Sequence, residues 1–212
     1  MGLAVTVGML SDLLEHDLEG AEWLQEAIRS ANSLLAAHKL PAHVEPNTPI
    51  RDASRCSLDS YPYSFLHYLR RIYAHVARDP NWQPQPVKDD EDPAEDPVVE
   101  EETMQMQSHL LCHSDAEGFY FPVDFEDVIF DEGGSLPGGM LGSTQRLMQE
   151  LITLAPYLGI KLQDGVLSDS EAARLNEESD AEGPFWIEVC VWLSLFEAAR
   201  LSLKHKAAIC FA

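Results

Sequence analysis

The chain has 212 residues, of which 36 are acidic and 14 are Lys or Arg, so its formal net charge is −22. Affinity for nucleic acid comes mainly from Lys and Arg, and anionic membranes attract the same side chains. The charge therefore argues against binding to nucleic acid or to a membrane. Hydrophobic residues make up 45% of the chain, which is enough for a folded core.

The length suits a single domain over residues 1–212, and we expect an α+β fold that is mostly helical. Residues 3–7 form a short apolar run that predicts an opening strand. Apolar side chains at helical spacing predict a helix over residues 12–38, which Gly20 divides into a short and a long part.

A second helix is predicted from Pro62 to about Arg78, because proline is favoured in the first helical turn. Its polar ridge includes Arg70, Arg71 and His75. Two interpretations are open for this ridge. The basic side chains pair with acids inside the protein, or they form a locally positive pocket for a small anionic ligand.

An acidic segment follows this helix, and it carries a large share of the charge. Between Lys88 and Glu102 there are nine acids and one lysine, so this stretch accounts for −8 and the other residues for −14. Prolines are frequent around it. We expect an acidic, Pro-rich, disordered loop at about residues 83–106. Its carboxylates are the candidate partner-binding groups: Asp89, Asp90, Glu91, Asp92, Glu95, Asp96, Glu100, Glu101 and Glu102.

Two segments that read as strands, at 108–114 and 119–123, flank a turn sequence that ends in Gly118. This pattern predicts a β-hairpin, and the turn adds Glu117 to the candidate partner-binding residues. We expect the hairpin to belong to a small antiparallel sheet. The sheet would pack under the C-terminal helix that opens at Pro184, which is apolar nearly all round and therefore typical of a central helix.

The same hairpin concentrates polar side chains, and His113, Asp115 and Asp124 are weak candidates for acid–base or metal chemistry. On a strand, His109 and His113 would lie about 13 Å apart, which is too far to share an ion. His113 and Asp115 alone supply only two ligands. We therefore expect a hydrogen-bonded turn, no metal, no cofactor and no catalytic residue.

Residues 113–125 read His113-Ser114-Asp115-x-x-Gly118-x-Tyr120-x-Pro122-x-Asp124-Phe125. This motif resembles that of a group of small uncharacterised bacterial proteins, although Phe119 replaces a tyrosine of the group. The opening residues 1–8 and the segment 139–145 resemble the same group. More loosely, the chain is similar to the acidic α+β immunity proteins of bacterial toxin systems. That similarity implies a protein that covers the basic active site of a toxin.

We therefore predict an acidic protein-binding module, of the kind that occludes the basic active site of a toxin such as a nuclease. The expected partner is a basic protein, with no nucleic acid and no membrane. Two alternatives stay open, a small hydrolase or metal-dependent enzyme that uses residues 113–124, and a non-catalytic adaptor. Four scattered cysteines without a secretory signal indicate a reducing, cytoplasmic location.

Overall fold

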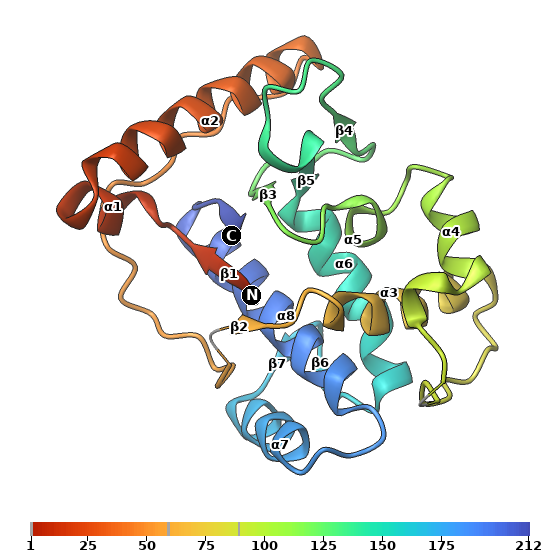
Figure 1. Cartoon of the computed structure of the whole chain (residues 1–212). Helices are drawn as coiled ribbons and strands as arrows, with labels where there is room; N and C mark the ends of the chain where they lie inside the picture. The colour runs from red at the N-terminus through yellow and green to blue at the C-terminus, as the bar shows by residue number, and fades with distance from the viewer. Residues whose placement is uncertain (1, 59, 89) are drawn as a thin grey trace.

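The computed structural model describes residues 2–58, 60–88 and 90–212, and it has a six-stranded sheet in the order β2-β1-β8-β3-β5-β4 (Figure 1). The strands of this sheet are β1 Leu3–Val7, β2 Ser60–Tyr61, β3 Gly118–Phe121, β4 Ile129–Phe130, β5 Met140–Ser143 and β8 Ile209–Phe211. A separate two-stranded ribbon joins β6 Leu162–Gln163 to β7 Val166–Leu167.

Helices make up most of the regular structure. They are α1 Leu10–His16, α2 Leu18–Ala37, α3 Phe65–Arg78, α4 Pro97–Thr103, α5 His109–Cys112, α6 Thr144–Leu154, α7 Asp169–Asp180 and α8 Trp186–His205. Short 3-10 turns cover Pro93–Glu95, Pro137–Gly139 and Ala155–Leu158. The predicted α+β class is confirmed.

The sheet is mixed, whereas the sequence predicted a purely antiparallel one. Strands β1 and β8 pair antiparallel, as do β8 and β3. Strands β3 and β5 run parallel, with Tyr120 opposite Gly142. A Cβ on Gly142 would lie 2.2 Å from the Tyr120 ring, so only glycine fits at this position of the parallel pair.

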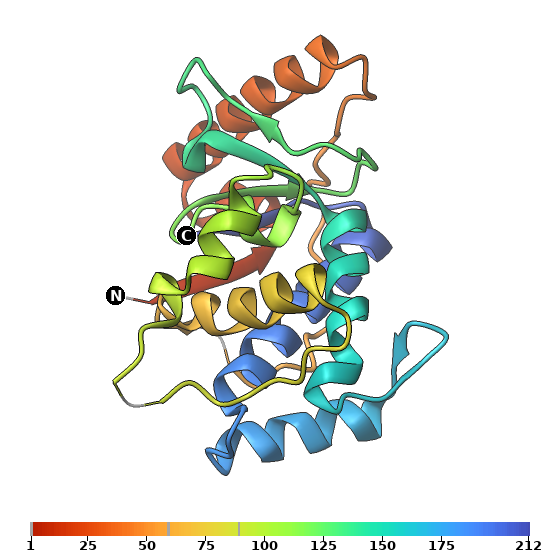
Figure 2. The ribbon, with the colours of Figure 1, turned by 90° about the vertical axis from the view of Figure 1, so that its right-hand side faces the viewer.

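Helices cover both faces of the sheet, so the molecule has three layers (Figure 2). Strand β3 shows the alternation that this requires, since Phe119 and Phe121 face α2 while Tyr120 faces the layer of α3, α6 and α8. The alternation places a hydrophobic cluster on each side of the sheet.

Helix α8 lies at the centre of the larger cluster, as its apolar sequence predicted, and it packs against α3, α6 and α7. The Trp192 indole is fully buried and its Nε1 donates to the Leu151 carbonyl at 2.7 Å. Buried Glu197 on the same helix is held by Arg55 and Arg200. The prediction of a central apolar C-terminal helix is confirmed.

The predicted hairpin at 108–123 is wrong, because its first half is helical. The Ser108 hydroxyl accepts from the backbone N–H of Leu111 at 3.0 Å and caps the short helix α5. Only Gly118–Phe121 is a strand, and its partners are the distant strands β5 and β8. The break in the N-terminal helix lies at Asp17 and not at Gly20 as predicted. The Asp17 carboxylate accepts a hydrogen bond from the Gly20 N–H at the start of α2.

The acidic segment contains helical turns where the sequence predicted a disordered loop. Asp92 and Asp96 act as N-caps, accepting from the N–H groups of Ala94 and Val98 at 2.9 Å each. A proline then occupies the first position of each helical turn. Val99 anchors α4 by packing against Ala74 of α3. The acids and prolines that indicated disorder are therefore helix-start residues here.

Replacing the cap of α4 tests this account. We expect Asp96→Ala to lower the free energy of unfolding by about 2 kcal/mol, since it removes a helix cap and a partly buried ion pair. Asp92→Ala, which removes only the cap of a 3-10 turn, should cost about 1 kcal/mol or less. Urea denaturation measures both values. Equal effects of the two substitutions would contradict the anchoring role of Asp96.

Candidate functional site

The basic ridge of α3 lies against the acidic segment and pairs with it. Asp96 accepts from Arg71 Nε at 3.1 Å and lies 2.8 Å from His75 Nε2. Arg78 binds Glu101 and Glu102 at 2.6 and 2.9 Å. The arginines of this ridge thus pair with acids of the same chain. This supports the first interpretation of the ridge, in which its basic side chains form ion pairs inside the protein.

The other carboxylates of the acidic segment differ in how much they are engaged. Glu91 pairs with Lys88 at 2.7 Å, whereas Asp90, Glu95 and Glu100 are exposed and make no ion pair in the described part of the chain. Asp89 lies outside the described residues. The predicted partner-binding residues are thus divided between groups that hold the fold and groups that face solvent.

Arg70 organises the turn that contains the candidate catalytic residues. Its side chain is buried, and it donates to the carbonyl oxygens of Leu110, at 3.0 Å, and His113 as well as to the Asp115 carboxylate. His67 Nε2 lies 3.2 Å from the same carboxylate. Although burial opposes it, these contacts lower the pKa of Asp115 to about 2.

His113 and Asp124 have other environments. The His113 ring is buried, its Nδ1 donates to the Ser114 carbonyl at 2.9 Å, and it stacks on Tyr120 with centroids 4.2 Å apart. Burial lowers the pKa of His113 to about 3, so the ring is neutral at physiological pH. Asp124 pairs with Arg146 of α6 at 2.8 Å. The structure therefore joins His113 and Asp115 through Arg70 but places Asp124 in a separate ion pair.

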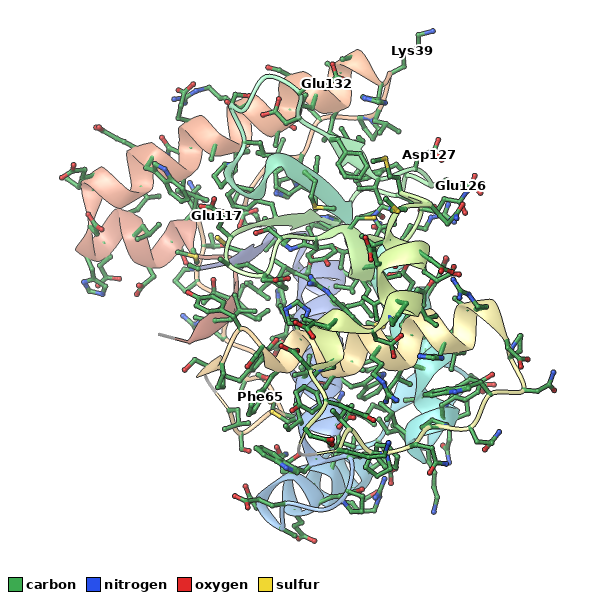
Figure 3. The ribbon with its side chains drawn as sticks, turned by 45° about the vertical axis from the view of Figure 1, so that its right-hand side comes forward. Lys39, Phe65, Glu117, Glu126, Asp127 and Glu132 are labelled. Carbon is green, nitrogen blue, oxygen red and sulfur yellow. The ribbon has the colours of Figure 1, made fainter. Side chains whose placement is uncertain are left out.

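A polar hollow of about 410 Å³, which no pattern in the sequence predicted, lies between α3, α5 and α6. In it Glu150 accepts from the N–H groups of His109 and Leu110, at 3.0 and 2.7 Å, and from the Tyr73 hydroxyl at 3.2 Å. Burial raises the pKa of Glu150 to about 7. Glu126, at the rim, extends outward beside Asp127 (Figure 3).

His109, in the same hollow, is held by two hydrogen bonds. Ser143 N–H donates to its Nδ1 at 2.9 Å, which leaves the proton on Nε2, the atom 3.1 Å from the Glu126 carbonyl. Burial lowers the pKa of His109. The ring is thus a neutral link between α5 and β5. Within residues 2–58, 60–88 and 90–212, no three His, Cys, Asp or Glu side chains gather closely enough to hold a metal ion.

A second acidic surface, which the sequence analysis missed, lies on α1 and α2. Glu19, Glu22 and Glu26 are all exposed, and they recur at a spacing of three and four residues on one helix. The opposite face of α2 carries buried Ala21, Leu24 and Ile28. The spacing of three and four was the signal that could have identified this row in the sequence.

Most cations of the protein are already paired with its own carboxylates. In the described part of the chain, ten of the 14 Lys and Arg side chains make ion pairs with Asp or Glu. Many exposed carboxylates make no ion pair with any residue that the structure describes, among them Glu19, Glu22, Asp90, Glu95, Glu100, Glu117, Glu126, Asp127, Glu132, Asp164, Glu177, Asp180 and Glu182. The negative surface is therefore left uncompensated.

Comparison with known proteins identifies the family to which this chain belongs. Residues 1–211 match a protein family described as "Putative DNA-mimic protein". The chain belongs to this DNA-mimic family. Neither the curated proteins nor the solved structures contain a match to it. Membership associates the protein with acidic proteins that imitate DNA in order to bind other proteins.

Membership in the DNA-mimic family also corrects one expectation. The prediction of a basic protein partner with no nucleic acid is wrong in its second part, because a DNA mimic imitates nucleic acid and binds proteins that bind DNA. The physical reason lies in the charge itself. A surface of carboxylates repels phosphates, and for the same reason it can replace them opposite Lys and Arg. Among the described residues, no helix combines the length and apolar character needed to cross a membrane.

The contacts of Arg70 predict a large effect of its removal. We expect Arg70→Ala to lower the free energy of unfolding of the DNA mimic by about 3 kcal/mol or more, because buried acceptors and Asp115 lose their partner. Arg29→Ala, which removes an exposed pair with Glu26, should cost about 0.5 kcal/mol or less. Similar urea midpoints for the two variants would contradict the structural role of Arg70.

The environment of Glu150 predicts a pH dependence. Its folded-state pKa of about 7 lies above the unfolded value of about 4.3, so the folded protein binds more protons between these limits. Stability therefore falls as the pH rises across this range. Glu188, also buried with a pKa of about 7, acts in the same direction. We expect Glu150→Gln to reduce the slope of urea stability against pH, and an unchanged slope would contradict this assignment.

Proposed function

We propose that this protein imitates the phosphate charge of duplex DNA and occupies the DNA-binding site of a DNA-binding protein. One observation carries the proposal beyond family membership: the exposed carboxylates that make no ion pair far outnumber the exposed cations. Such a surface attracts a cleft lined by Lys and Arg at long range.

The amount of charge also suits this function. Duplex DNA carries one negative charge per about 1.7 Å of axis, so −22 equals the charge of about 37 Å of duplex. A folded chain of 212 residues has an expected diameter of about 43 Å. The protein therefore carries its charge at a density close to that of the DNA it would replace.

Carboxylates that are fixed on helices make better phosphate substitutes than those on a flexible chain, because less conformational entropy is lost on binding. Exposed Glu95 and Glu100 lie in or next to α4, which Asp96 and Val99 anchor to α3. In this proposal the predicted partner-binding residues Asp90, Glu95, Glu100 and Glu117 are candidate contacts. The paired carboxylates of the same segment serve the fold.

The narrower hypothesis of an immunity protein is one case of this function, in which the occupied DNA-binding site is the active site of a toxic nuclease. The identity of the partner decides between this case and a protein that controls DNA binding more generally. We place the activity in the cytoplasm, where DNA-binding proteins meet the genome.

Release by DNA tests the proposal. The protein is immobilised, exposed to a lysate of its own organism, and eluted at constant salt with a duplex of about 20 base pairs. Elution with poly-glutamate of equal total charge is the control. We expect at least one protein that the duplex releases and poly-glutamate does not. The absence of such a protein, or equal release by the two polyanions, would overturn the proposal.

A further inference from the structure

Helix α2 exposes large apolar side chains within an acidic surface. Trp23 is 52% exposed and Leu18 is 67% exposed, and Leu14 of α1 is 38% exposed, whereas Leu24, Ile28 and Leu35 of α2 are buried against the sheet. Exposed tryptophan is uncommon on a protein without a partner, and buried tryptophan is enriched among the residues that contribute most to protein–protein binding. The exposed Trp23 is therefore a candidate contact residue for a protein partner.

The charge around Trp23 indicates the chemistry of the partner surface that would cover it. Residues 2–28 contain six acids and no Lys or Arg, and the first cation, Arg29, already pairs with Glu26. Glu19 and Glu22 are exposed and unpaired beside Trp23 on the same helix. Along α2 they lie about 4.5 Å apart, and phosphates of one DNA strand follow each other every 3.4 Å or so of axis. An arginine-lined surface is complementary to this arrangement.

Packing holds this face in place. Helix α2 has 20 residues and buries Leu24, Ile28 and Leu35 against the sheet. The Trp23 ring lies 6.5 Å from that of Phe119 in β3, so one edge of the indole contacts the core while the rest is exposed.

We infer that the α1–α2 face, centred on Glu19, Glu22 and Trp23, is the surface that enters the DNA-binding site of the partner. The inference rests on the proposed function and adds the location and the chemistry of contact. The carboxylates replace phosphates opposite arginine side chains. The indole face accepts a guanidinium group, a contact that stacking and cation–π attraction both favour.

The acidic segment is the competing surface, and part of its charge is already neutralised by arginines of α3. Asp96, Glu101 and Glu102 are bound to α3, so a partner arginine would have to displace Arg71 or Arg78. Glu19 and Glu22 need no such exchange, and neither do Asp90, Glu95 and Glu100 of the acidic segment. The α1–α2 face is distinguished from the acidic segment by the exposed Trp23 beside its unpaired carboxylates.

Matched pairs of substitutions test the inference. Glu19→Gln with Glu22→Gln removes two unpaired carboxylates three residues apart on α2. Glu177→Gln with Asp180→Asn removes an equally spaced pair on α7, at the far end of the molecule (Figure 1). Both double variants change the net charge by the same amount. Circular dichroism establishes that each variant is folded.

The readout is the retention of the duplex-released proteins that the unmodified protein captures. We expect the α2 double variant to retain them about fivefold more weakly and the α7 variant to retain them as the unmodified protein does. Trp23→Ala should weaken retention about tenfold. Equal losses for both double variants would overturn the inference, because the total charge and not the face would then matter.

A third double variant, Glu95→Gln with Glu100→Gln, tests the alternative that the acidic segment makes the contact. Loss of retention here, with the α2 variant unaffected, would overturn the inference and transfer the contact to the acidic segment. If the unmodified protein itself captures nothing that duplex DNA releases, the proposed function fails. If a protein is captured and released by duplex DNA but its retention does not depend on the α2 substitutions, the proposed function stands and only the location of the contact is wrong.

Discussion

The protein uses its few cations for its own fold, and this constraint determines both its architecture and its surface. Ten of 14 Lys and Arg side chains pair with acids of the same chain in the described structure. Several of these pairs join elements that are distant in sequence, such as Arg70 with Asp115. What remains outside is a surface of carboxylates. A DNA mimic needs this division, because free cations would neutralise the charge that imitates phosphate.

Helix α3 illustrates how the division is made. Arg70 points to one side and holds the turn before β3, while Arg71 and Arg78 hold the acidic segment. Each arginine offers several donors, so one side chain can fix a whole turn of chain. The acidic segment is thereby ordered without a large apolar contact, with Val99 as its main buried anchor.

Local sequence signals predicted the elements that local forces determine. The apolar patterns of the opening strand β1 and of α8 were correctly interpreted. The strand expected at 108–114 was wrong, because the contacts that fix it as a helical turn come from Arg70 and Glu150, remote in sequence. The exposed acids of α2 were visible as a periodic pattern. Only the structure shows which carboxylates already have partners.

Mimicry of DNA means that the protein and DNA exclude each other from one site. Native mass spectrometry of a duplex-released partner, mixed with both the protein and duplex DNA, tests this most directly. The account predicts two binary complexes, partner with protein and partner with duplex, and no ternary complex at any ratio. A ternary complex would show that the protein binds its partner away from the DNA site, and it would contradict the central claim.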